Sequence, residues 1–234
     1  MTERPEQLAF DLPHRAATGV EDFLVSASNA EAVELIDRWP HWPSHAIVIS
    51  GPSGAGKSHL VNVWRSRSDA AVVAADEVDD PTVGLLVERR ALAVEDVAAG
   101  VGSERVLFHL LNTARENGLT MLVTTREPPG DLALQLPDFR SRLKALPHVA
   151  LAPPDEALLA ALLVKLIADR QLQVDPLVVA TLVRHMERSA SAAVRVIAEI
   201  DRRQLATRRK VSRALALECL NAIGAGSGAA DADD

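Results

Sequence analysis

The sequence predicts an α/β fold, in which a parallel sheet of five strands is covered by helices on both faces and is followed by a small all-helical lid subdomain. Two observations predict it. Up to about residue 153, short β-branched or small apolar runs alternate with helical patterns, an order that favours parallel strands. From about residue 154 onward, only helical periodicity continues. A chain of 234 residues is long enough for two subdomains that share an interface.

The α/β subdomain is expected to span residues 21–153. Its first element is a helix near residues 28–38, with Ser28 as N-cap, and the prolines of the WPHWP run end it. Strands are predicted at residues 45–50, 70–75, 91–95, 120–125 and 148–154. Helices are predicted at residues 57–67 and 103–118, the second ending at Gly118.

The all-helical subdomain is expected to span residues 154–224. Apolar residues recur at helical spacing in four segments, at residues 155–171, 175–189, 191–209 and 212–223. Cys219 lies in the last segment and is expected to be a small buried core residue. As the single cysteine, it excludes an internal disulfide and a multi-cysteine metal site. Residues 225–234 are small and acidic and are predicted to be disordered.

Charge and hydropathy exclude other classes of protein. The formal net charge of −7 argues against a broad nucleic-acid-binding surface. A local basic segment leaves a weak DNA contact open, with a solvated helix face as the simpler interpretation. Its cations are Arg202, Arg203, Arg208, Arg209 and Lys210. No apolar run reaches the roughly 20 residues of a membrane helix, and the first residues lack a secretory signal, so we expect a cytoplasmic protein.

A glycine-rich loop carries the strongest chemical signal. GPSGAGKSHL, residues 51–60, matches G-x-x-x-x-G-K-[ST] between a predicted strand and a predicted helix. The glycines let backbone N–H groups point at phosphate oxygens, and the helix N-terminus adds positive potential. Lys57 is expected to reach the outer phosphates and Ser58 to coordinate Mg²⁺. The candidate residues for binding ADP or ATP are Gly51, Pro52, Ser53, Gly54, Ala55, Gly56, Lys57, Ser58 and His59.

Two neighbouring strands end in polar residues that suit nucleotide chemistry. Glu95 and Asp96 close one strand, where a carboxylate can order Mg²⁺ and water together with Ser58. The alternative is a pair of surface acids at a strand end. Thr124 and Thr125 close the next strand and are candidates to contact the γ-phosphate or its water.

Two arginines are candidates for different tasks. Arg142, two residues after Arg140, lies on a short helix before the last predicted strand, where it could reach a neighbouring subunit. A guanidinium supplied in trans stabilises transition-state charge in phosphoryl transfer. Arg195 lies near the start of a helix in the all-helical subdomain and could fold onto a bound nucleotide. For both, an exposed helical arginine is the alternative.

The N-terminal residues 1–20 have the composition of a flexible arm, yet they include QLAFDLP. Gln7 precedes Leu8, Phe10 and Leu12, whose alternation is typical of an extended peptide that places side chains in pockets. Either these residues pack on their own protein, or they bind another one.

Taken in order, these segments resemble an AAA+ module of the DnaA type, and more closely the short Hda-type relatives of the bacterial initiator. The anchors of the resemblance are QLAFDLP, FLVSASNAEAV, GPSGAGKSHL, ALAVEDV, LVTTREPP, LPDFRSRL and AAVRVIAEIDR. It implies a Walker B acid at Glu95 or Asp96, a sensor at Thr124 or Thr125, an arginine finger at Arg142 and a lid arginine at Arg195. It also places Phe23, Leu24 and Val25 beside the adenine.

Two features favour the Hda type over the initiator. After Ile223 the sequence leaves no room for a DNA-binding helix-turn-helix domain, and QLAFDLP resembles the motif that bacterial proteins insert into the sliding clamp, the β subunit of DNA polymerase III. The resemblance implies a negative regulator of replication initiation that stimulates hydrolysis of ATP bound to DnaA and itself acts with ADP bound. Glu95 and Arg126 stand where Asp is usual, so weak or no intrinsic ATPase activity is expected.

Two other functions remain open at this point. One is a self-sufficient AAA+ ATPase such as a helicase loader, and the other is a non-catalytic adaptor that binds the clamp. The sequence does not decide between ADP and ATP as the working ligand, or between a monomer and a homo-oligomer.

Overall fold

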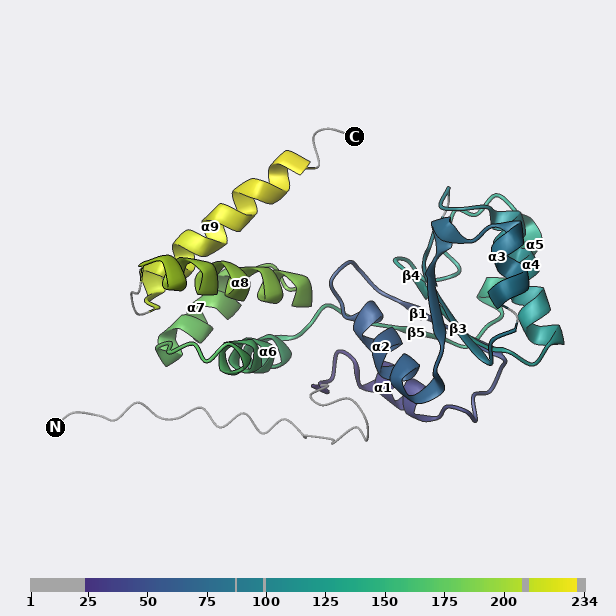
Figure 1. Cartoon of the computed structure of the whole chain (residues 1–234), viewed down its shortest axis with the longest axis horizontal. Coiled ribbons are helices and arrows are strands. Elements are labelled where there is room, and N and C mark those ends of the chain that lie inside the picture. The colour runs from purple at the N-terminus through teal and green to yellow at the C-terminus, as the bar shows by residue number, and fades with distance from the viewer. Residues whose placement is uncertain (1–23, 87, 99, 208–210, 231–234) are drawn as a thin grey trace. The chain divides into compact units, whose positions relative to one another are not determined.

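The computed structural model describes residues 24–86, 88–98, 100–207 and 211–230 (Figure 1). The chain divides into two compact units. The described part of the α/β unit is Ala27–Pro153, and the helical unit comprises Leu24–Ser26 together with the chain from Pro154 onward. The N-terminal arm, with Gln7, Leu8, Phe10 and Leu12, lies outside the described residues, as does Phe23.

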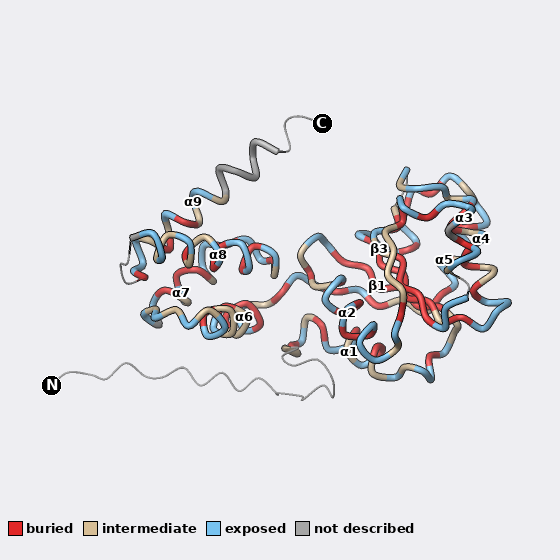
Figure 2. Tube along the Cα trace, viewed as in Figure 1, coloured by how far each residue is buried: buried red, intermediate tan, exposed pale blue. Residues whose placement is uncertain are grey.

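The α/β unit is built on a parallel five-stranded sheet in the order β2-β3-β4-β1-β5, which confirms the predicted sheet. The strands are β1 (Ala46–Ser50), β2 (Ala71–Ala74), β3 (Ala91–Val97), β4 (Thr120–Thr125) and β5 (His148–Ala150). The central strands β1 and β4 are buried almost throughout (Figure 2), because helices cover both faces.

Each face of the sheet has its own apolar core. Ile47 and Ile49 point to the face covered by α1 (Ala30–Asp37) and α2 (Lys57–Ser68), whereas Ala46 and Val48 point to the opposite face. This alternation follows from the two-residue period of a strand. The opposite face is covered by α3 (Asp80–Leu86), α4 (Glu104–Glu116) and α5 (Pro137–Lys144). The sequence patterns do not predict α3 or the 3₁₀ turn Ala75–Glu77.

The three tryptophans of the chain form one cluster in the α/β unit. Trp64 of α2 is fully buried, stacks on Trp42 at a centroid distance of 5.1 Å and meets Trp39 edge-on at 6.4 Å. Aromatic pairs in these geometries add to the free energy of burial. The cluster therefore anchors the helix that begins with Lys57, and it supplies an intrinsic fluorescence signal on that helix.

In the described residues of the helical unit, the helices are α6 (Glu156–Asp169), α7 (Pro176–His185), α8 (Ala190–Thr207) and α9 (Arg213–Ala230). Asp155 caps α6 by accepting the N–H of Leu158, and Asp175 caps α7 by accepting the N–H of Leu177. Cys219 is fully buried in this core, as predicted, and burial raises the pKa of its thiol.

Helix α9 runs further than the sequence predicts. Its backbone is helical to Ala230, past the end of the helix predicted at residues 212–223. Alanine has the highest helix propensity, and extending an existing helix costs less than nucleating one. Among the residues that the structure describes, no helix is long and apolar enough to cross a membrane.

Candidate functional site

The loop from Gly51 to Gly56 connects the end of β1 to the start of α2. Gly54 and Gly56 have φ values of 75° and 107°, a region that side chains disfavour. A Cβ added to Gly51 would lie 2.8 Å from the carbonyl oxygen of Leu151, so this position needs glycine for close packing. These three glycines give the loop the tight curl that the motif predicts.

Lys57 is held over this loop by the loop itself. Its buried Nζ donates hydrogen bonds to the carbonyl oxygens of Gly51, at 2.7 Å, and Pro52, at 3.1 Å. Burial lowers the pKa of Lys57, while the nearby carboxylates, Asp96 above all, act in the opposite direction. The ammonium is therefore fixed at the carboxyl end of β1, with acidic groups close to it.

The N-terminus of α2 faces the same loop. Its N-cap is Gly56, and no side chain caps the first turn. Uncapped N–H groups and the helix dipole favour an anion at this position. Ser53, Ser58 and His59 are exposed around it. With Lys57, the arrangement fits the phosphates of a nucleotide.

The acidic pair lies on a β-bulge in β3. Val94 pairs with Val123 and Val97 with Thr125, so Glu95 and Asp96 together face the single residue Thr124. Asp96 takes a left-handed conformation, with φ 56°, and its N–H donates to the hydroxyl of Thr124 at 3.0 Å. The bulge thus changes the direction of the strand at the two carboxylates.

The two predicted threonines have different partners. The hydroxyl of Thr124 accepts a hydrogen bond from the N–H of Asp96, whereas the hydroxyl of Thr125 donates one to the carbonyl oxygen of Glu127 at 2.6 Å. Thr124 is therefore the threonine in contact with the acidic pair. Nothing in the sequence distinguished it from Thr125, because the bulge is visible only in the pairing of β3 with β4.

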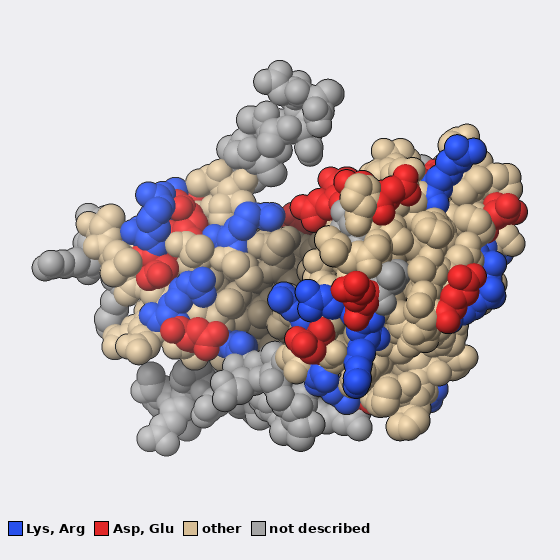
Figure 3. Space-filling model, turned by 45° about the vertical axis from the view of Figure 1, so that its right-hand side comes forward, with Lys and Arg blue, Asp and Glu red and all other residues tan. Residues whose placement is uncertain are grey.

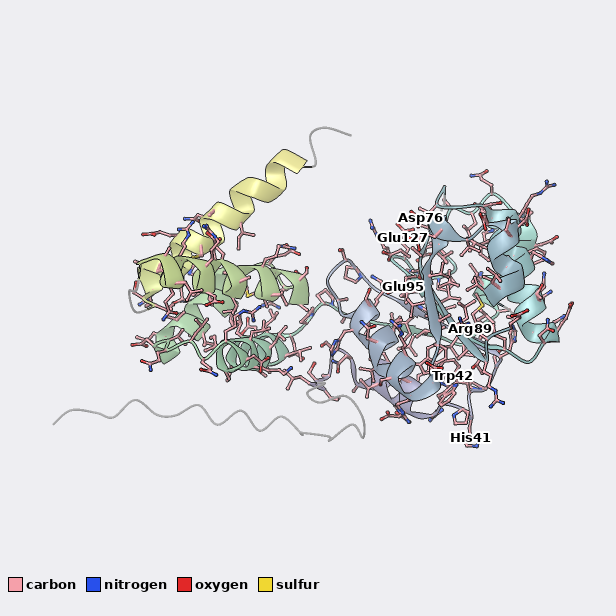
Figure 4. All side chains as sticks on the ribbon, in the orientation of Figure 1. His41, Trp42, Asp76, Arg89, Glu95 and Glu127 are labelled. Carbon is pink, nitrogen blue, oxygen red and sulfur yellow. The ribbon has the colours of Figure 1, made fainter. Side chains whose placement is uncertain are left out.

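Glu95 has a free coordinating atom. Its Oε1 is buried and makes no hydrogen bond with any described residue. A buried carboxylate oxygen without a partner is costly, and a divalent cation or its water is a suitable one. Figure 4 shows Glu95 at the same end of the sheet as Asp76 and Glu127. The donor set at the carboxyl end of the sheet thus fits Mg²⁺.

Arg126 adds a cation to this end of the sheet. Its exposed guanidinium lies near enough to Lys57 to lower the pKa of the ammonium. The sequence marks Arg126 only as a departure from a family pattern. The structure adds that this positive charge stands near Lys57.

Arg142 lies at the other end of the sheet. It occupies the last turn of α5, and its charge lowers the pKa of His45, as do burial, the largest cause, and Arg115. His45 directly precedes β1, and its carbonyl oxygen accepts the N–H of Met121 at 2.8 Å. Arg89 and Trp42 lie toward this end in Figure 4.

The two ends are separated by the length of a strand. Lys57 follows β1 and His45 precedes it, and a strand of five residues spans roughly 17 Å. Within the part of the chain that the structure describes, half-buried Arg142 makes no ion pair. Arg140, two residues earlier on α5, is exposed.

The remaining predicted residues belong to the helical unit. Arg195 is exposed on α8 and pairs with Glu187 at 3.7 Å, and Leu24 and Val25 are half-buried.

In the basic segment, Glu199 accepts hydrogen bonds from Arg202, at 2.7 and 2.8 Å, and from Arg203, at 2.6 Å. These bonds lower the pKa of Glu199 to about 2. Residues 208–210 lie outside the described chain. On the face drawn in Figure 3, basic and acidic side chains lie near one another on the helical unit.

No protein-family model and no curated protein matches the chain. Solved structures do. Domain III of the replication initiation protein DnaA from Thermotoga maritima is 18% identical, with a TM-score of 0.73, over 85% of this chain and 93% of that one. DnaA from Aquifex aeolicus bound to AMPPCP is 16% identical, with a TM-score of 0.67, over 82% of this chain and 66% of that one.

A third structure, the Holliday junction branch migration motor RuvB from Thermotoga maritima, is 12% identical, with a TM-score of 0.66, over 83% of this chain and 68% of that one. At these identities the likeness shows a shared fold. The chain therefore has the AAA+ fold that its sequence predicts, with an α/β unit followed by a helical unit.

Proposed function

We propose that this protein is an Hda-type regulator of replication initiation. It binds ADP or ATP with Mg²⁺ at the loop Gly51–Ser58, binds the sliding clamp through Gln7–Leu12, and stimulates hydrolysis of the ATP bound to DnaA by supplying Arg142 in trans. Hydrolysis would convert the initiator to its ADP form and so restrain replication.

The single observation that carries this proposal is the separation of Lys57 from Arg142. Lys57 follows β1, whereas Arg142 lies near His45, which precedes that strand, and a strand of five residues spans roughly 17 Å. At that end of the sheet, Arg142 lies away from the protein's own glycine-rich loop. A guanidinium without an ion pair among the described residues, at the far end of the sheet, is suited to another protein's active site.

The roles at the protein's own site follow from the contacts there. On binding, the phosphates would replace the loop carbonyls as partners of Lys57 and would accept hydrogen bonds at the N-terminus of α2, which no side chain caps. The ligands proposed for Mg²⁺ are the Ser58 hydroxyl and a carboxylate of Glu95 or Asp96. When bound, the ion neutralises phosphate charge. The role of the protein in its own site is binding, because Arg126 replaces the usual acid there.

Similar structures support the choice of ligand and process. DnaA from Aquifex aeolicus holds the adenine nucleotide analogue AMPPCP. Another structure of the replication initiator DnaA, also similar to this chain, holds AMPPCP and single-stranded DNA. The regulator type rests on the sequence resemblance, above all on QLAFDLP. Gln7 would hydrogen-bond at the rim of the clamp pocket, while Leu8, Phe10 and Leu12 would fill it.

A second candidate is an ATPase that acts alone. The observation in its favour is the pair Glu95 and Asp96 on a bulge beside Lys57, held by Thr124, because bulges often place functional side chains. In this case the protein hydrolyses ATP without DnaA, and Lys57→Ala abolishes the turnover.

One assay separates the candidates. DnaA loaded with labelled ATP is mixed with this protein, clamp and DNA, and released phosphate is counted. We expect hydrolysis of DnaA-bound ATP to accelerate only when the clamp is present. In the Arg142→Ala variant, the stimulated rate should be at least about a hundredfold lower. Arg140→Ala, on the same helix, is the control and should retain it.

Other outcomes contradict the proposal. If Arg142→Ala retains full activity while Gln7→Ala with Leu8→Ala abolishes it, the protein is an adaptor. If DnaA-bound ATP is unaffected and the protein hydrolyses free ATP, it is an ATPase in its own right.

A further inference from the structure

Helix α5, which carries Arg142, receives a contact from the start of a different helix. Glu104 is the first residue of α4, and its two carboxylate oxygens accept the N–H groups of Gln135 and Leu136, at 3.0 and 2.6 Å. Both amides lie directly before α5. Hydrogen bonds to an ionised carboxylate are stronger than those between neutral groups.

The sequence of α5 leaves its N-terminus in need of this contact. Its N-cap is Leu136, which has no side-chain oxygen, and Pro137 at the first helical position has no N–H. A helix of eight residues has little cooperative stability of its own. The carboxylate of Glu104 takes the place of a local cap, across more than thirty residues of chain.

Helix α4 also holds α5 through an apolar contact. Phe139 and Leu143 are buried on the inner face of α5, and the ring of Phe139 meets Phe108 of α4 edge-on at 6.4 Å. The direction of α5 is thus set at two points, by a carboxylate at its start and by an aromatic pair one turn later. Arg142 lies beyond both points, in the last turn.

The position of Glu104 is itself fixed from the nucleotide end of the sheet. Gly102 has a φ of 65°, and a Cβ there would lie 2.3 Å from the carbonyl oxygen of Ala75, so this segment packs tightly on the turn after β2. Ser103 then caps α4 by accepting the N–H of Val106. From Glu95 and Asp96 on β3, the chain reaches Glu104 within nine residues.

We infer that Glu104 is a positioning residue for Arg142: its carboxylate fixes the start of α5, and so the direction in which the guanidinium is presented to the nucleotide of a partner protein. This inference rests on the proposed function for the identity of that partner. The contact between Glu104 and the two amides stands independently of it.

The test compares Glu104→Ala, Glu104→Gln and the control Glu116→Gln, an exposed carboxylate at the other end of α4. In the DnaA-bound ATP assay, we expect Glu104→Ala to lower the maximal rate roughly 10- to 100-fold, because small errors of position are costly in catalysis. The DnaA concentration for half-maximal rate should change less than about twofold. Glu104→Gln, which keeps one carbonyl acceptor, should have a maximal rate between those of Glu104→Ala and the wild type. The control Glu116→Gln should have the wild-type rate.

A second measurement does not depend on activity. Amide hydrogen exchange at Gln135 and Leu136 should accelerate at least about tenfold in Glu104→Ala, while the exchange of β1 and β4 amides stays as in the wild type. The inference is overturned if Glu104→Ala leaves both the maximal rate and these two amides unchanged. It is also overturned if the rate falls only in proportion to a loss of folded protein, measured by tryptophan fluorescence.

The two proposals fail in different ways. If wild-type protein does not stimulate DnaA, the proposed function fails, and faster exchange at the two amides in Glu104→Ala still supports the role of Glu104 in holding α5. If wild-type protein stimulates DnaA and Glu104→Ala does so equally well, only the positioning role fails. In the Arg142→Ala background, Glu104→Ala should produce no further loss of rate, because the group that it positions is gone.

Discussion

The two ends of the same sheet are built for different tasks. At the carboxyl end, three glycines, a buried lysine and a bulge with two carboxylates form a concentrated, largely prearranged site. At the amino end, Arg142 stands at the edge of a short helix beside His45. The carboxyl end gathers a lysine, a glycine-rich loop and two carboxylates, whereas at the amino end Arg142 makes no ion pair among the described residues. Under the proposed function, the carboxyl end binds this protein's own nucleotide, and the amino end contributes one group to the nucleotide site of another protein.

The largest effect is expected from Lys57→Ala. Removing the ammonium that faces the loop should weaken ADP binding at least a hundredfold, roughly 2.7 kcal/mol. Fluorescence of the tryptophan cluster, which includes Trp64 on the same helix, measures the affinity. Arg142→Ala should leave that affinity within about twofold, and a large loss there would mean that the two ends are not independent.

Glu95→Gln and Asp96→Asn sharpen the assignment at the carboxyl end. If the unpartnered oxygen of Glu95 is the metal ligand, Glu95→Gln should remove most of the tightening of ADP binding by Mg²⁺, about tenfold or more, and leave metal-free binding unchanged. Calorimetric titration with and without Mg²⁺ measures both quantities. If only Asp96→Asn reduces the tightening of ADP binding by Mg²⁺, the metal ligand is Asp96 and not Glu95.

Thr124→Val tests how the bulge is held. It leaves the N–H of Asp96 without its acceptor, which should lower the free energy of unfolding by about 1–2 kcal/mol. Denaturant titration measures the change. Mg²⁺-dependent binding should weaken together with it, because the carboxylates lose their fixed direction. Thr125→Val is the matched variant, and it should spare the metal effect; equal losses from both threonines would contradict the assignment to Thr124.

The smallest effect is a pKa change at the amino end. The positive charge of Arg142 lowers the pKa of His45, so Arg142→Ala should raise it. Burial, the largest cause, and Arg115 remain in the variant, so only part of the shift should disappear. An NMR titration of the imidazole measures the direction, with Arg140→Ala as control. An unchanged pKa would show that Arg142 does not lie beside His45 in solution.

Much of the fold and part of the site could be predicted from local patterns. Periodicity predicts the five strands and the helices α6, α7, α8 and α9, and one motif with a known geometry predicts the curled glycine-rich loop. The same patterns did not detect α3 or the helical turns of α9 beyond residue 223. In that last segment, alanine favours a helix although the sequence lacks helical periodicity.

The sequence by itself determined that this chain forms an AAA+ fold with a loop shaped for phosphates, because those properties depend on residues close together in the chain. Only the tertiary structure decided which threonine holds the acidic pair, where Arg142 lies relative to Lys57, and that Glu104 caps α5. The hydrogen bonds of Thr124 and of Glu104 join residues 28 to 32 positions apart in the chain. Only strand order and helix packing bring such residues together.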